Sequence, residues 1–129
     1  MEEQLVALLL SAAGLTALVP ATSIEWGRSS QGASLPRIVL QRIDGFRDYH
    51  MQGASGYVAS RVQIDVYGER YLTTKTIVDA VRSLLSGYRG GIFQGIFLDG
   101  ERDLPAADAG DVKHLFRTSL DFMIHHKET

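Results

Sequence analysis

Three carboxylates alternate late in the sequence, at Asp99, Glu101 and Asp103. If one strand runs through them, alternation places all three on the same face, where their oxygens suit Mg²⁺ or Ca²⁺. The glycine of an EF-hand calcium loop is missing, because Leu104 follows Asp103 directly. Arg102 also lies between two of the acids and supplies a countercharge. The pattern therefore favours a solvated strand end over a metal site.

The four histidines, His50, His114, His125 and His126, do not have the spacing of metal ligands. His125 and His126 are neighbours, and neighbours on a regular strand point to opposite faces, so they cannot ligate one ion together. The chain has no cysteine, which excludes disulfides, thiolate chemistry and cysteine metal sites. We expect no metal ion and no cofactor.

Glycine-rich stretches occur at Gly27–Gly32 and Gly87–Gly95. Neither contains Gly-Lys-Ser/Thr, and neither has the GxGxxG form of a strand-to-helix phosphate loop. Gly53–Gly56 reads Gly-Ala-Ser-Gly, which resembles a nucleophile elbow only superficially, because its flanks differ. These segments indicate turns, and we predict no catalytic residue and no enzyme activity.

Charged residues on the outward faces of two predicted strands are the better candidates for function. Arg61 and Asp65 alternate on one strand, and Arg117 and Asp121 on another, so they could pair across a sheet or between subunits. The alternative is a solvated face, where such ion pairs contribute little to the stability of the fold. Further residues on these faces are Gln63, Tyr67 and Met123. Because aromatic residues, Met and Arg are enriched at interfaces, we predict an interface here.

The elements that position these residues follow from hydrophobic periodicity. Helices are predicted over Glu2–Ala13, with one more turn before Pro20, and over Tyr71–Ser86. The apolar stripe of the second helix is predicted to comprise Leu72, Ile77, Val78, Val81, Leu84 and Leu85. The predicted strands are Ser23–Trp26, Arg37–Ile43, Tyr57–Tyr67, Gly91–Asp103 and His114–His126.

Face assignments follow from alternation within these strands. In the fourth strand, Ile92, Ile96 and Leu98 are placed on one face and Phe93 and Phe97 on the other. The segments between the elements, Gly27–Pro36, Asp44–Gly56 and Leu104–Lys113, are predicted as loops. Asp44–Gly56 has about a dozen residues, longer than ordinary hairpin loops, and includes Arg47, Asp48 and Tyr49 as candidate contacts with a partner.

Composition fits one domain spanning residues 1–129, with 45% apolar and 22% charged residues. The net charge is −2, which lacks the basic excess of a dedicated nucleic-acid binder. The apolar N-terminal run follows two glutamates and is too short to span a bilayer, so we expect neither a signal peptide nor a membrane segment. The element order predicts an α+β fold: an antiparallel or mixed sheet of about five strands, with two helices packed on one face.

Four segments in this order resemble the tail-completion, or tail-terminator, family of long-tailed bacteriophages and related gene transfer agents. They are Leu35–Ile43, Arg61–Tyr67, Ala80–Leu85 and Arg117–Phe122. The resemblance runs over nearly the whole chain, from the N-terminal helix to the last strand. Its motifs are structural and not chemical, and Arg37 replaces the aromatic residue expected after Leu-Pro.

The resemblance implies a structural virion protein with no enzyme activity and no cofactor. It implies a ring, usually a homohexamer, that caps the finished tail tube, ends its polymerisation and joins it to head-completion, or stopper, proteins. DNA would pass through the lumen without specific binding, and the protein would be assembled in the host cytoplasm and reside in the virion. The alternatives are another head-tail connector or minor tail protein, or a small enzyme or ligand-binding α+β domain with a pocket near Asp99, Glu101 and His114.

Overall fold

A computed structural model of the chain describes residues 2–27, 36–50, 53–105 and 116–127. The predicted loops Gly27–Pro36 and Leu104–Lys113, together with His114, lie largely outside these ranges. In order, the elements are α1 (Glu2–Ser11), α2 (Ala13–Thr16), the 3-10 turn η1 (Ala21–Ser23), β1 (Ile24–Trp26), β2 (Arg37–His50), β3 (Gly53–Gly68), α3 (Tyr71–Leu85), β4 (Phe93–Pro105) and β5 (Phe116–Lys127).

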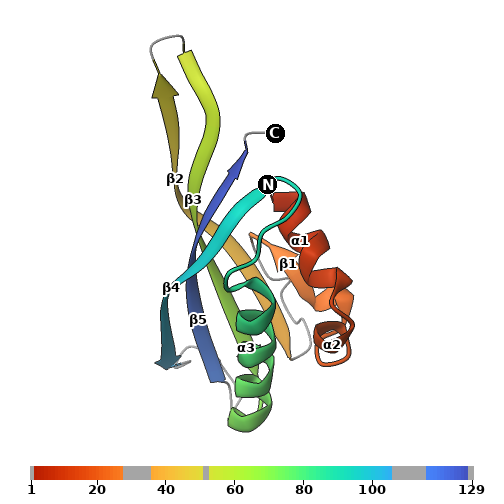
Figure 1. The fold of residues 1–129 in the computed structure, drawn as a ribbon. Helices are drawn as coiled ribbons and strands as arrows, with labels where there is room; N and C mark the ends of the chain where they lie inside the picture. Colours follow the sequence, from red (N-terminus) through yellow and green to blue (C-terminus); the bar gives the residue numbers. More distant parts are fainter. Residues whose placement is uncertain (1, 28–35, 51–52, 106–115, 128–129) are drawn as a thin grey trace.

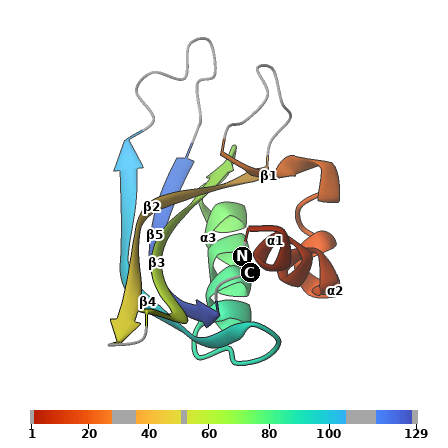
Figure 2. The same cartoon turned by 90° about the horizontal axis from the view of Figure 1, so that it is seen from above.

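The five strands form one mixed sheet in the order β1-β2-β3-β5-β4. β1 runs parallel to β2, and every other neighbouring pair is antiparallel. Figure 2 shows α3 and α1 on the same side of this sheet, with the other side bare. The predicted α+β class, with a mixed sheet and two main helices on one face, is confirmed. Among the described residues, none of the helices has the length and apolar character needed to cross a membrane.

The core lies between the sheet and the two long helices. Alternate residues of β3 and β5 face it, so Val62, Ile64 and Val66 are fully buried beside Leu120 and Phe122. The helices contribute Leu5 and Leu9 from α1, and Ile77, Val78, Val81 and Leu85 from α3. Burial of these aliphatic side chains is the dominant stabilising term, at about 1.5–3 kcal/mol for each fully buried Leu, Ile or Phe.

The prediction of a loop over Asp44–Gly56 is wrong, because residues 44–50 and 53–56 extend the paired strands β2 and β3. Pairing continues through Tyr49↔Ala54 and His50↔Gly53, with register shifts between Arg42 and Asp44 and between Arg47 and Tyr49. The glycines in this segment predict interrupted strands. In the structure, β-bulges accommodate the shifts in register, and pairing between the strands provides hydrogen-bond partners for the backbone groups. We call residues 44–50 and 53–56 the arm. Figure 1 shows it projecting past the ends of the other strands.

The predicted faces of β4 need correction, because two register shifts interrupt its alternation. One shift lies between Phe93 and Gly95 and the other between Leu98 and Gly100. Phe93 is therefore buried in the core, at 7% exposure, whereas Phe97 is 55% exposed on the bare side. Each bulge adds one residue to β4 and so exchanges the two faces beyond it.

Leu72 was assigned to the apolar stripe of α3, and this assignment is also wrong, because its side chain is 78% exposed. Thr74 occupies the buried position in the first turn, and its hydroxyl donates to the Arg70 carbonyl at 2.7 Å. Gly68 makes room for Thr74, since a Cβ at Gly68 would lie 2.2 Å from the Thr74 hydroxyl oxygen.

Candidate assembly interface

The bare side of the sheet, which we call the open face, carries the residues singled out on β3 and β5. The antiparallel register places Tyr67 opposite Arg117 and Gln63 opposite Asp121. Strand alternation adds Arg61 and Asp65 to the same face, because the residues between them point into the core. The structure thus gathers six of the nine interface candidates on one surface, which none of the described helices covers (Figure 2).

Asp65 lies at the centre of a polar network on the open face. Its carboxylate accepts hydrogen bonds from Arg117 Nη2 at 3.0 Å and from Gln63 Nε2 at 3.0 and 3.1 Å. The guanidinium carbons of Arg117 and Arg37 lie 5.5 and 4.9 Å from the centre of the Tyr67 ring, which is cation–π range. These neighbours leave Asp65 only 5% exposed, although it lies on the face without helices.

Two further ion pairs extend the network toward β4. Arg61 pairs with Asp99, and Arg102 Nη1 lies 3.5 Å from an oxygen of Asp121. Both pairs contain a side chain more than half exposed, so water screens them and each contributes little to stability. These pairs extend the polar network of the open face from β3 and β5 to β4.

Sequence reasoning missed several residues of this surface, notably Arg37, Arg102 and Ser119. Ser119 is 1% exposed, and its hydroxyl has no hydrogen-bond partner within the described residues. Alternation placed it on the outward face correctly, but its burial results from side chains on the neighbouring strands. Burial by side chains of neighbouring strands depends on the order of the strands in the sheet, which no local sequence pattern predicts.

The other three candidates, Arg47, Asp48 and Tyr49, lie apart from this network. Their backbone belongs to the β2 side of the arm, beyond the residues of β2 that face the polar network. Their side chains lie outside the part of the chain that the structure describes. The candidates therefore fall into two surfaces, the open face and the arm.

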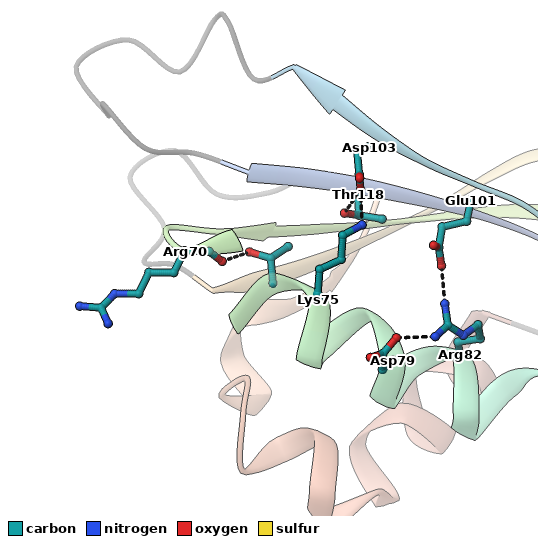
Figure 3. A network of polar contacts seen from close by, with 8 residues as sticks. Arg70, Lys75, Asp79, Arg82, Glu101, Asp103 and Thr118 are labelled. Carbon is teal, nitrogen blue, oxygen red and sulfur yellow. Dashed lines mark hydrogen bonds and ion pairs between the residues drawn. The ribbon is translucent and has the colours of Figure 1, made fainter. Parts of the chain in front are cut away.

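The predicted alignment of Asp99, Glu101 and Asp103 on one face is wrong. The bulge beside Gly100 leaves Asp99 on the open face with Arg61, whereas Glu101 and Asp103 point toward α3. There Glu101 accepts a hydrogen bond from Arg82 at 2.8 Å, and Asp103 pairs with Lys75 (Figure 3). Among the described residues, no three His, Asp or Glu side chains converge as metal ligands.

The contacts of Asp103 shift two pKa values in opposite directions. Hydrogen bonds from Lys75 and then Thr118 lower the pKa of the Asp103 carboxyl, and the same bond to Asp103 raises the pKa of Lys75. Thr118 donates to Asp103 at 2.8 Å. Both groups stay charged near neutral pH, so this cluster joins α3 to β4 and β5 and does not act as an acid or base.

His125 and His126 point to opposite faces, as predicted. The His125 ring packs edge-on against Phe97 on the open face, at 5.6 Å between ring centres. His126 is buried on the core side, where Nε2 lies 2.9 Å from the Ser60 hydroxyl and Nδ1 lies 2.9 Å from the Lys127 carbonyl oxygen. Burial lowers the pKa of His126. Because they lie on opposite faces of the sheet, the two rings cannot bind the same metal ion.

Comparison with known proteins assigns the chain to a family. The family model described as "Tail completion protein gp17" matches residues 3–127. A chain in a solved structure titled "Virion of native gene transfer agent (GTA) particle" has the same fold, with a TM-score of 0.71 and 21% sequence identity. That match covers 94% of this chain and 90% of the other. Among curated proteins, none matches this sequence.

The family match defines the chain as a tail completion protein, a component of the virion tail. The chain belongs to the tail completion protein gp17 family, because the family model covers nearly all of it. The predicted resemblance to tail-completion proteins is therefore confirmed.

Proposed function

We propose that this protein forms a homo-oligomeric ring, a hexamer in the simplest case, that caps the tail tube. The ring ends tube polymerisation and joins the tail to the head-completion, or stopper, protein. The observation that carries the proposal is the open face: a charged and aromatic surface, left uncovered by the described helices and strands, in a tail completion protein. Arg, Tyr and Met are the residue types enriched at protein interfaces.

In this proposal the open face and the arm make different contacts during assembly. The open face, with Arg61, Gln63, Asp65 and Tyr67 opposite Arg117 and Asp121, joins neighbouring subunits. The arm, with Arg47, Asp48 and Tyr49, contacts the tail tube or the neck. An arm that projects beyond the sheet is suited to reaching a partner stacked above or below the ring (Figure 1).

Size and charge support a ring through which DNA passes. Radius-of-gyration scaling gives a globule about 36 Å across for this length, and six touching globules leave a hole of about the same width. Duplex DNA fits through such a hole. A net charge of −2 suits a lumen in which DNA slides without binding.

The native mass of the purified protein, measured by light scattering with and without its tail-tube protein, tests this proposal. A mass near six subunits, or a ring that forms only on the tube, supports it. A strict monomer under both conditions rules it out. Binding to portal complexes and not to the open end of tail tubes would instead favour another head-tail connector.

A further inference from the structure

A buried histidine lies where the arm meets the body of the sheet. β5 pairs with β3 as far as Tyr57↔Lys127, and His126 belongs to the preceding pair. Beyond Tyr57, the described residues of β3 pair only with β2, and Figure 1 shows these two strands continuing past the end of β5. We call residues 57–59 and 125–127, which join β3 to β5 at this point, the arm base.

Two hydrogen bonds fix the form of the His126 ring. Nδ1 lies 2.9 Å from the Lys127 carbonyl oxygen, which can only accept, so Nδ1 carries the hydrogen and donates. In the neutral ring Nε2 is then an acceptor, and the Ser60 hydroxyl donates to it at 2.9 Å. Ser60 is fully buried and His126 is 5% exposed. The neutral ring therefore links β5 to β3 with a partner at each nitrogen.

A second proton on the His126 ring disrupts this arrangement. Nε2 becomes a donor toward Ser60, so the hydroxyl hydrogen has to turn to another acceptor. The residue opposite Ser60 on β2 is Gly45, which offers no side-chain acceptor. A Cβ at Gly45 would lie 3.7 Å from Ser60 Oγ and 3.9 Å from Arg42 Nη1, so a guanidinium lies close to the Ser60–His126 pair.

The surroundings of His126 disfavour the charged ring. Burial is the main cause that lowers its pKa, and the guanidinium of Arg42 from β2 and the N-terminal amine act in the same direction. Glu2 from α1 and the hydrogen bond to the Lys127 carbonyl oppose them. The residue opposite His126 on β4 is the uncharged Phe93, and the Lys127 side chain points to the other face of the sheet.

The end of β5 is where a charged ring reaches water at the lowest cost. Opening the pairs of Lys127 and His126 with β3 exposes the ring, whereas Ile124, two residues earlier, is fully buried in the core. The Lys127 amide also donates to the Ile92 carbonyl at 3.0 Å, and this bond breaks in the same opening. Strand ends open locally at a much lower free energy than the whole domain unfolds.

We propose that His126 is an acid-sensitive link between β5 and β3, and that protonation of its ring opens the arm base and lengthens the free part of the arm. The open form takes up a proton at the ordinary pKa of 6.5, and the closed form does so only at a lower pKa. Opening is therefore favoured as pH falls from 6.5 toward the pKa of the closed form. This inference concerns the arm base alone and does not depend on the proposed ring.

Amide hydrogen exchange of the purified protein, measured by mass spectrometry and corrected for the pH dependence of intrinsic exchange, tests the link. Protection of residues 57–59 and 125–127 should fall by up to about tenfold for each pH unit below 6.5. Low urea should leave this exchange unchanged, whereas exchange at Leu120 and Phe122 should quicken, because it requires global unfolding. The link is wrong if the arm base does not respond to acid, or if it exchanges only together with the core.

Two exposed residues give variants with opposite expected effects. Arg42→Gln removes a cation that lowers the pKa of His126, so the response of the arm base to acid should weaken. Glu2→Gln removes an anion that raises this pKa, so the response should strengthen. A merely structural role of these side chains would not give opposite changes in the pH profile. Effects of the same sign, or no effect of either, overturn the proposal.

Replacing the histidine itself completes the test. His126→Gln should abolish the response of the arm base to acid, because glutamine does not titrate. The matched control, His125→Gln on the open face, should leave the response unchanged. If the arm base of the His126 variant still opens in acid, another group is responsible and the proposal fails. If that variant does not fold, the opposite effects of Arg42→Gln and Glu2→Gln decide the question.

Discussion

At the residue scale, Asp65 shows how a charged side chain is buried on a sheet face without helices. Arg117 and Gln63 satisfy its carboxylate, and Tyr67 holds the guanidinium of Arg117 in place through a cation–π contact. A carboxylate at 5% exposure depends on these donors, because burying it without them would carry a large desolvation cost. Asp65 therefore organises the surface that we assign to assembly.

Replacing Asp65 tests its importance to the fold. We expect Asp65→Asn to lower the free energy of unfolding by about 1–3 kcal/mol, since Arg117 loses a charged acceptor in a mostly buried position. Denaturant unfolding measures this change. Asp99→Asn is the matched control on the same face, and its more exposed pair with Arg61 should change stability by less than about 0.5 kcal/mol. Equal effects of the two substitutions would contradict the prediction.

His126 predicts how stability depends on pH. Burial holds its pKa below the ordinary value of 6.5, so the folded state releases a proton that the unfolded chain keeps. The stability from neutral His126 is present above 6.5 and is lost as pH falls from there toward the folded pKa. The hydrogen bond to the Lys127 carbonyl and the charge of Glu2 oppose the shift, while Arg42 and the N-terminal amine favour it.

Unfolding experiments across pH test this assignment. His126→Gln should flatten the fall in stability as the solution is acidified below pH 6.5, at some cost in stability at neutral pH. The control, His125→Gln on the open face, leaves the contribution of His126 in place. An unchanged pH dependence in the His126 variant would show that other groups control acid stability.

At the scale of elements, α3 contacts the sheet through close packing at its first turn and through ion pairs along one side. Gly68, the last residue of β3, packs against Thr74 in the first turn of α3. Lys75 and Arg82 then reach Asp103 and Glu101 on β4 (Figure 3). The bulge in β4 makes these pairs possible, because it turns both carboxylates toward the helix.

A methyl group at Gly68 should disturb this junction. We expect Gly68→Ala to lower the free energy of unfolding by about 1–3 kcal/mol, because the new Cβ would overlap the Thr74 hydroxyl. Chemical denaturation measures the loss. Gly100→Ala is the control, since a Cβ there meets nothing within 4 Å. The Gly68→Ala, Thr74→Ala double variant should recover part of the loss, and its failure to do so would implicate the backbone.

At the scale of the whole molecule, the domain presents an open face and an arm projecting past the body (Figures 1 and 2). In the proposed ring, the open face would meet a neighbouring subunit and the arm a partner stacked on the ring. The core beneath them is continuous and well packed, so surface substitutions should alter assembly without unfolding the domain.

The arm gives a prediction at this scale. We expect the triple substitution Arg47→Ala, Asp48→Ala, Tyr49→Ala to weaken binding to tail-tube protein by about tenfold or more, because aromatic and Arg side chains dominate interfaces. The thermal midpoint should change little, since the arm projects beyond the core. Co-sedimentation with tubes measures binding, and the control is Arg89→Ala, an exposed residue after α3. If the arm variant binds tubes as well as the unmodified chain, the arm does not contact the tail tube.

The sequence determined the class of the protein and most of its elements. The 3.6-residue period of α1 and α3 and the strict alternation in β3 and β5 are local signals, and the structure follows them closely. Because outward positions follow from alternation, the candidates on β3 and β5 lie on the outward face of the sheet, as predicted. The ordered segments Leu35–Ile43, Arg61–Tyr67, Ala80–Leu85 and Arg117–Phe122 were enough to indicate the tail-completion family.

Only the tertiary structure decided where alternation fails and what covers each residue. The bulges in β4 put Phe93 and Phe97 on opposite faces and separated Asp99 from Glu101. Pairing between distant segments turned a glycine-containing loop into the arm. Burial of Asp65 depends on strand order, which brings Arg117 beside it. These outcomes arise from contacts between residues far apart in sequence, and local periodicity carries no information about them.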